Sequence, residues 1–205
     1  MASLLSYALT NVSDVKESLG IVSSDQSYDN LITRKINQVT RQIEAYCSRR
    51  FKSTTYTQEE YNATNTDQII LYQRPVIGAI TLEVRDTSLN SADYETIEST
   101  LYFVDENAGL INTLFNARGR WSRFLITYTA GYAIIPEDLA EAAATLAAYY
   151  TINPDGGDVG IAEKREGQRL IRYSNANLSF KTIMENLGVD EIINSYSNNP
   201  VMTDR

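Results

Sequence analysis

The spacing of apolar residues changes along this chain of 205 residues, and this change constrains the fold class more than any other feature. From residue 29 to residue 49 an apolar side chain recurs at every third or fourth position, which places an apolar stripe along one face of an α-helix. The stripe consists of Ile32, Ile36, Val39, Ile43, Tyr46 and Cys47. We therefore expect a long helix that packs against a second apolar surface.

From residue 54 the apolar period falls to two, which is typical of strands that bury one face. The clearest example is the segment 79–85, in which three aliphatic residues alternate with small or charged ones. A turn-rich loop at 105–109 has the length of a hairpin connection. Strands are predicted at residues 79–85, 101–104, 110–114 and 124–130.

An alanine-rich segment follows these strands. Pro136 is suited to the first turn of a helix, and the two acids after it complement the positive end of the helix dipole. The predicted helix extends to about residue 151, and its alanines allow a close approach of the first long helix. These are Ala142, Ala143, Ala144, Ala147 and Ala148. A shorter helix is expected between Asn11, as its cap, and Gly20, which ends it.

Together these elements predict an α+β protein that forms one unit over residues 1–205. Its small helical core, a long helix plus an alanine-rich helix, is expected to comprise residues 10–53 and 136–152, with an inserted antiparallel β-meander domain at 54–131. Residues 153–205 are expected to form a flexible loop and an extended C-terminal arm that contains a short helix near 180–187. The arm carries little apolar surface, so we expect it to become ordered against a neighbouring protein.

The composition excludes most enzymatic chemistry. The chain has no histidine and one cysteine, Cys47, which removes Ser/His/Asp and Cys/His nucleophilic sites, disulfides and His- or Cys-based metal sites. Adjacent acids such as Glu59 and Glu60 are the remaining acid/base candidates, but a turn or a helix start explains such pairs more simply. We expect no catalytic residues, no cofactor and no metal.

The sequence also indicates a protein outside membranes. The N-terminus lacks the basic start of a secretory signal, and the longest apolar stretch, residues 139–152, contains Glu141 and falls short of a bilayer span. The net charge of −8 argues against a surface that holds nucleic acid by counterion release. An intracellular protein, or one packed into a particle, is the resulting expectation.

Three groups of residues are candidates for contacts with other molecules. The first group is a cluster of basic residues around Trp121, formed by Arg118, Arg120 and Arg123. Such a combination is typical of residues that lie close to DNA, although a loop leading into a strand explains it as well. A mixed run with Lys164, Arg165, Arg169 and Arg172 is read as a solvated face or as a site that docks onto an acidic neighbour. The candidate partner-binding residues of the arm are Tyr173, Phe180, Ile192, Ile193 and Tyr196.

The order of several short patterns resembles a known family. A short helix ends at Gly20 before an acidic loop, and Glu44 and Tyr46 precede the pattern Ser48-Arg49-Arg50-Phe51. The matching segments are residues 15–21, 43–51, 71–76 and 126–132, followed by Pro136 and a run of alanines. Over about residues 10–151 this order is similar to the head-to-tail connector, or adaptor, family of tailed bacteriophages. Residues 192–196 are loosely similar to the C-terminal segment that such adaptors place against the portal.

The resemblance implies a structural adaptor of the virion neck, made in the host cytoplasm. It implies a homo-oligomeric ring of twelve copies beneath the portal protein, which joins the portal to the next neck or tail protein. DNA would pass through the channel without sequence-specific binding, and no membrane is involved. The alternatives are another neck or tail-completion subunit, a carbohydrate-binding or glycosidase module suggested by the aromatic β region, and a DNA-binding module.

Overall fold

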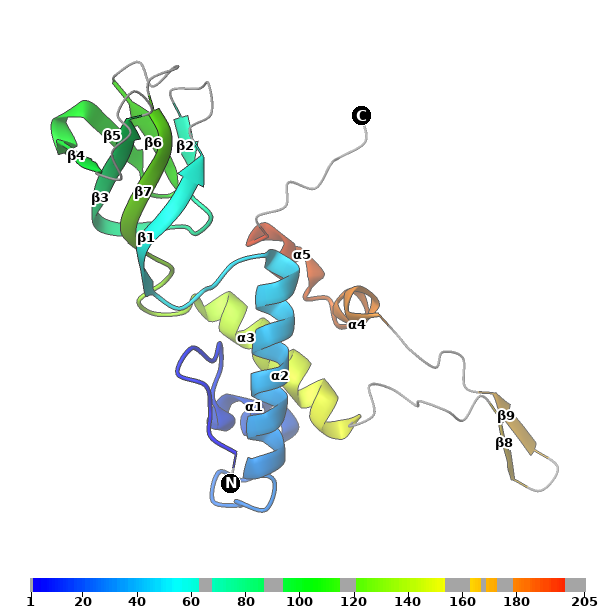
Figure 1. The fold of residues 1–205 in the computed structure, drawn as a ribbon. Helices are drawn as coiled ribbons and strands as arrows, with labels where there is room; N and C mark the ends of the chain where they lie inside the picture. Colours follow the sequence, from blue (N-terminus) through cyan, green and yellow to red (C-terminus); the bar gives the residue numbers. More distant parts are fainter. Residues whose placement is uncertain are drawn as a thin grey trace. The chain divides into compact units, whose positions relative to one another are not determined.

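The computed structural model describes residues 2–62, 68–86, 94–114, 121–153, 163–166, 169–172 and 179–197. The chain divides into two compact units, each described here by itself (Figure 1). A helical unit comprises Met1–Ser48 and Ile135–Arg205, and a β unit comprises Arg49–Ile134. The predicted α+β class is confirmed, with helices and antiparallel sheets in separate parts of the chain.

The first helix, α1 (Val12–Leu19), begins and ends at the predicted residues. The Asn11 side chain accepts a hydrogen bond from the backbone N–H of Asp14 at 3.0 Å, which satisfies one of the free donors at the helix start. Gly20 ends the helix in the left-handed region, with φ 66°.

The long helix α2 (Asp29–Cys47) buries the predicted apolar stripe. Four aliphatic side chains are fully buried along it: Ile32, Ile36, Val39 and Ile43. Burying one such side chain contributes about 1.5–3 kcal/mol, so this face accounts for much of the stability of the helical unit. Tyr46 departs from the expected stripe because it is only half-buried.

Helix α3 (Glu137–Ile152) follows Pro136 and packs against α2, as its alanines predict, and also against α1. Eight of its residues are buried, on all sides of the helix: Leu139, Ala142, Ala143, Ala144, Leu146, Ala147, Ala148 and Tyr150. A helix that is apolar all round belongs in the interior of a bundle. Helix α3 is thus the centre of the helical unit.

The described residues of the C-terminal arm include two helices, α4 (Phe180–Leu187) and α5 (Asp190–Ser195). The Ser179 side chain accepts a hydrogen bond from the backbone N–H of Thr182 at 3.2 Å and caps α4, which occupies the predicted residues. Both helices pack on α3; Ile183 and Met184 of α4, Ile193 of α5 and Val189 between the helices are buried. The sequence did not indicate that this part of the arm packs within its own chain.

Strands β8 (Glu163–Glu166) and β9 (Arg169–Arg172) form an antiparallel hairpin between α3 and α4. Glu163 pairs with Arg172 and Glu166 pairs with Arg169 in the backbone register. The mixed run of charges indicates a surface segment, and the sequence does not predict this hairpin.

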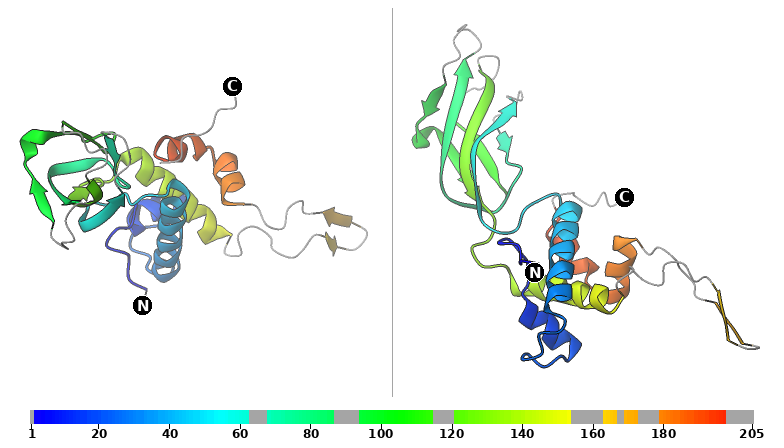
Figure 2. Two further views of the ribbon diagram at one scale, coloured as in Figure 1. Left: turned by 45° about the horizontal axis from the view of Figure 1, so that its top comes forward. Right: turned by 60° about the horizontal axis from the view of Figure 1, so that its bottom comes forward.

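The described residues of the β unit form seven strands and one 3₁₀ turn, and the strands make up two antiparallel sheets (Figures 1 and 2). The strands are β1 (Thr54–Asn62), β2 (Gln68–Ile70), β3 (Val76–Asp86), β4 (Glu95–Ile97), β5 (Tyr102–Asp105), β6 (Leu110–Thr113) and β7 (Trp121–Ala130), with the 3₁₀ turn η1 at Ser99–Leu101. One sheet has the order β1–β7–β3–β4, and the other has the order β2–β6–β5. Figure 2 shows β1 in cyan beside β7 in yellow-green, although they lie far apart in the sequence.

The predicted alternation places the core of the β unit between the two sheets. Leu82 and Val84 of β3 are fully buried, as are Ile126 of β7 and Ile111 of β6. The hairpin β5–β6 closes through residues 106–109, where the sequence predicted a turn. These contacts cross from one sheet to the other and make the β unit a small two-layered domain.

Candidate interaction surfaces

Four of the five candidate residues of the arm are described by the structure, and they differ in exposure. Phe180, Ile192 and Tyr196 are partly exposed, whereas Ile193 is fully buried in the helical unit. Tyr173 lies outside the described residues. Phe180 of α4, Ile192 of α5 and Tyr196, which follows α5, therefore lie partly at the surface, whereas Ile193 holds α5 in place from inside.

Polar contacts fix the arm on the helical unit. The Tyr196 hydroxyl donates to the Asp138 carboxylate, with 2.8 and 2.9 Å to its two oxygens. The Tyr46 hydroxyl donates to Asn194 Oδ1 at 2.7 Å, and the Phe180 ring meets the Tyr46 ring edge-on at 5.9 Å between centroids. Helix α5 is therefore attached to the end of α2 and to the start of α3.

The candidate basic cluster is only partly described. Arg118 and Arg120 lie outside the described residues, and Trp121 is described only as the first residue of β7. Arg123 is half-exposed, and its Nη1 lies 2.5 Å from Glu60 Oε1 on the neighbouring strand β1. Glu60 thus offsets the Arg123 charge, an arrangement expected for a solvated strand pair.

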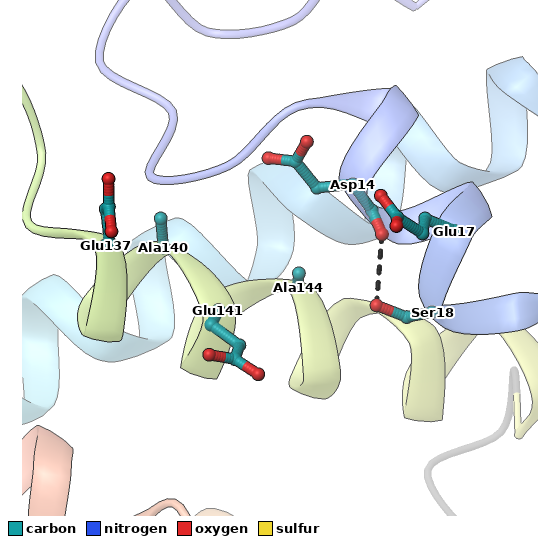
Figure 3. A pocket seen from close by; sticks show the side chains of 7 residues that line it. All are labelled: Asp14, Glu17, Ser18, Glu137, Ala140, Glu141 and Ala144. Carbon is teal, nitrogen blue, oxygen red and sulfur yellow. Dashed lines mark hydrogen bonds between the residues drawn. The ribbon is translucent and has the colours of Figure 1, made fainter.

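The structure reveals an acidic pocket that the sequence analysis did not anticipate (Figure 3). It has a volume of about 450 Å³ and lies between α1 and α3. Its lining residues are Asp14, Glu17, Ser18, Glu137, Ala140, Glu141 and Ala144. Ser18 donates to the backbone oxygen of Asp14 at 3.0 Å, and Asn11 Nδ2 donates to the Asp14 carboxylate at 2.8 Å.

The pocket offers negative charge rather than reaction chemistry. Four carboxylates surround a floor of two alanines, and the chain contains no histidine that would serve as a base beside them. Such a surface repels phosphate groups and attracts cations. The sequence showed acids on each helix, but only the packing of α1 on α3 places the acids of the two helices around one hollow.

Buried tyrosines form a second polar cluster, inside the β unit. The Tyr128 hydroxyl donates to Glu59 Oε2 at 2.6 Å, Tyr61 donates to the same oxygen, and the two hydroxyls lie 3.0 Å apart. Burial, and then the hydrogen bond to Glu59, raise the pKa of both tyrosines above the ordinary value. The hydroxyls therefore remain protonated donors, and the cluster joins β1 to β7.

Arg49, in the family-like pattern that follows α2, is buried near one end of the β unit. Its guanidinium donates to the backbone oxygen of Arg74 and lies 5.0 Å from the ring centroid of Phe51 and 5.7 Å from that of Tyr132. Because its charge is buried and satisfied by a carbonyl and two aromatic rings, Arg49 stabilises the fold and is not available to bind a ligand. The second, third and fourth resembling segments, which contain Phe51, Arg74 and Tyr132, thus meet at this arginine.

Gly131 is required at the same place by a close approach of two backbones. A Cβ atom on Gly131, whose φ is +110°, would lie 2.7 Å from the Phe51 oxygen and 2.9 Å from Lys52. Tyr132 donates to the Phe51 oxygen at 2.6 Å, and Ser53 donates to the Tyr132 oxygen at 3.0 Å. The pattern Ala130-Gly131-Tyr132 is therefore explained by the close approach of two backbone segments rather than by a binding site.

In the part of the chain that the structure describes, no helix is both long and apolar enough to span a bilayer. Within the same residues, no group of three or more His, Cys, Asp or Glu side chains is arranged to hold a metal ion.

Solved structures that share the fold of this chain include three from gene transfer agent particles. A chain from the virion of a native gene transfer agent (GTA) particle has a TM-score of 0.60 and 18% identity, covering 99% of this chain and 96% of that one. Chains from the neck of an empty GTA particle and of a native GTA particle have TM-scores of 0.57 and 0.55 and identities of 17% and 18%. In both, the match covers 100% of this chain and 97% of the other.

Comparison of the sequence with family models gives a more specific result. No curated protein sequence matches the chain. The model of the head completion protein family matches residues 8–154, which include α1, α2, the whole β unit and α3. This match confirms the relationship that the order of the sequence patterns predicted, and the chain belongs to the head completion protein family.

Proposed function

We propose that this protein is a structural subunit of a virion neck, where it forms a ring between the portal protein and the next neck or tail protein. The observation that carries the proposal is the family match over residues 8–154. The fold, shared along nearly the full length with chains from GTA necks, supports it. The function is mechanical: the protein holds neighbours together.

The symmetry of the similar particles suggests the form of the assembly. The two neck structures are described as computed with C12 and with C6 symmetry. Identical subunits form a closed ring when one surface of each copy binds a different surface of the next. We propose twelve copies of this chain around one axis.

The charge of the protein supports a role as a conduit for DNA. The net charge is −8, and the acidic pocket between α1 and α3 adds local negative potential. Like charges give passing phosphates nothing to bind, so DNA would slide through such a ring without sequence-specific contacts. A basic channel would retard it.

The arm provides the proposed contact with the portal. Phe180 of α4, Ile192 of α5 and Tyr196 after α5 expose part of their side chains, and Tyr173 precedes them in the sequence. Aromatic and aliphatic residues of this kind are common in permanent protein interfaces. We propose that these four residues contact the partner while the buried Ile193 supports them.

A reconstitution experiment with the portal protein tests this function. The purified full chain is mixed with its cognate portal and, separately, with the next neck or tail protein, and each mixture is analysed by sedimentation. We expect a complex with both partners. Binding to the tail-side protein alone would support a tail-completion subunit instead, and normal joining of heads to tails in particles that lack the protein would refute a neck function.

A further inference from the structure

Helix α5 of the arm is too short to be stable by itself. It has six residues, and an isolated helix of fewer than roughly 12–15 residues is hardly populated in water. Its order therefore depends on contacts with another surface. Those contacts decide whether the arm is folded before a partner arrives or only afterwards.

The structure provides that surface within the same chain. Ile183, Met184, Val189 and Ile193 are buried where α4 and α5 pack on α3. A segment that folds only on its partner leaves such side chains uncovered in the free protein. The apolar contacts of the arm are thus complete in a single subunit.

Two hydrogen bonds attach the end of α5 to the ends of two long helices. The Tyr46 hydroxyl, near the end of α2, donates to Asn194 Oδ1 at 2.7 Å. The Tyr196 hydroxyl donates to the carboxylate of Asp138, in the first turn of α3, at 2.8 and 2.9 Å. Because they lie on either side of the short helix, the two bonds fix its rotation as well as its position.

The rotation of α5 decides which of two adjacent isoleucines faces outward. Successive residues of an α-helix are about 100° apart around its axis, so Ile192 and Ile193 cannot both face the core. Ile193 is fully buried, and Ile192 is partly exposed. A turn of α5 by roughly 100° would exchange them. The contacts that set this rotation therefore select the residue that is presented to a partner.

We propose that Tyr46 and Asp138 are positioning residues of the portal contact, which hold α5 in the rotation that presents Ile192 before the portal is bound. The inference rests on the portal contact of the proposed function. The arm then binds as a preformed surface, and the binding energy is not spent on ordering it. The affinity depends on the fraction of subunits in which the arm is already ordered.

Hydrogen exchange of the free full-length chain tests the ordering. The amides of Ile193 and Tyr196 donate to the oxygens of Val189 and Ile193 at 3.1 and 3.2 Å, so they are protected only while α5 is formed. In the wild type we expect them to exchange at least about 100-fold more slowly than in an unstructured chain. Tyr46→Phe and Asp138→Ala should each accelerate this exchange by about 2–10-fold, the effect of one lost hydrogen bond. Asp138→Asn keeps an acceptor oxygen and should exchange as the wild type does.

The matched control is Tyr149→Phe. It removes a partly exposed hydroxyl about 16 Å further along α3 than Asp138 and should leave the exchange of α5 unchanged. Unprotected α5 amides in the wild type would show that the arm folds only on a partner, and would overturn the proposal. The same exchange in Tyr46→Phe, Asp138→Ala and the control would overturn it as well, because α5 would then be held without these two hydrogen bonds.

Portal binding measures the consequence of the ordering. Calorimetric titration with the cognate portal compares the wild type with Tyr46→Phe/Asp138→Ala, and with the same pair plus Ile193→Ala, which removes the buried anchor of α5. We expect the dissociation constant to rise by the factor by which hydrogen exchange shows the ordered fraction to fall. Wild-type affinity in a variant whose arm is largely disordered would overturn the proposal. No binding by the wild type would refute the portal contact of the proposed function, whereas the exchange rates test the positioning of α5 independently.

Discussion

Lys16 Nζ lies 2.6 Å from Asp29 Oδ1, and the lysine side chain is almost completely buried. The ammonium also donates to the backbone oxygen of Ser23 at 3.3 Å, so it joins α1, the loop after it and the first residue of α2. A buried charge of this kind stabilises a fold only while its partners remain in place.

The first prediction removes this charge. Lys16→Met is expected to lower the free energy of unfolding by about 1–3 kcal/mol, because Asp29 loses its cation but keeps contact with water. The matched control is Lys181→Met, which removes an exposed lysine 3.9 Å from Glu185 and should change stability by less than about 0.5 kcal/mol. Urea unfolding measures both, and equal effects would contradict the structural role of Lys16.

The second prediction concerns the backbone crossing at Gly131. Gly131→Ala should destabilise the β unit by at least about 2 kcal/mol, because a Cβ atom there meets the backbone of Phe51 and Lys52. Gly78→Ala is the control: its φ is +74°, but nothing lies within 4 Å of the added atom. The control should cost only about 1 kcal/mol, from the left-handed conformation alone. Thermal unfolding followed by near-UV circular dichroism compares the two variants.

The third prediction is a loss of stability at alkaline pH. Burial raises the pKa of Tyr61 and of Tyr128 in the folded protein, so both hydroxyls stay protonated there while they ionise in the unfolded chain above about pH 10. Their contribution to stability is therefore complete below pH 10 and is lost as pH rises further, by up to about 1.4 kcal/mol per pH unit for each group.

The measurement is urea unfolding between pH 8 and pH 11.5. Tyr61→Phe should reduce the slope of stability against pH relative to the wild type. Parallel slopes in the two proteins would show that the Tyr61 hydroxyl ionises in the folded state as readily as in the unfolded one.

The fourth prediction tests the arm. Ile192→Asn should weaken the complex with the portal by about tenfold or more, since it replaces a partly exposed apolar contact by a polar side chain of similar size. The neighbouring exposed residue gives the control, Glu191→Gln, which should bind as the wild type does. Surface plasmon resonance with immobilised portal measures both, and unchanged binding by Ile192→Asn would remove this residue from the interface.

The helices were predictable because their signals are local. The stripe from Ile32 to Cys47 repeats within a few residues, and the caps at Asn11 and Gly20 lie next to the helix that they limit. The strand order was not predictable, because β7 separates β1 from β3 and pairs Phe124 with both Tyr61 and Val84. Nothing in the spacing of apolar residues specifies which distant strand supplies the partner.

The surfaces were less predictable than the elements. Arg49 stood out as part of a family-like pattern, but its burial between Phe51 and Tyr132 depends on contacts between distant segments. The alternation of β5 and β6 indicated one inner and one outer face, yet Phe103 and Leu110 read equally well as core residues. Their exposure follows from the direction in which the small sheet packs, which only the folded structure reveals.

The hydrogen bonds that join Tyr132 to Phe51 and Ser53 place the two ends of the β unit side by side. The strands between residues 53 and 132 can then change in length without altering the distance between the points where the chain enters and leaves the β unit. Two parts connected in this way can diverge at different rates. A lineage can remodel the appendage to suit a new neighbour while the helices keep their ancestral packing.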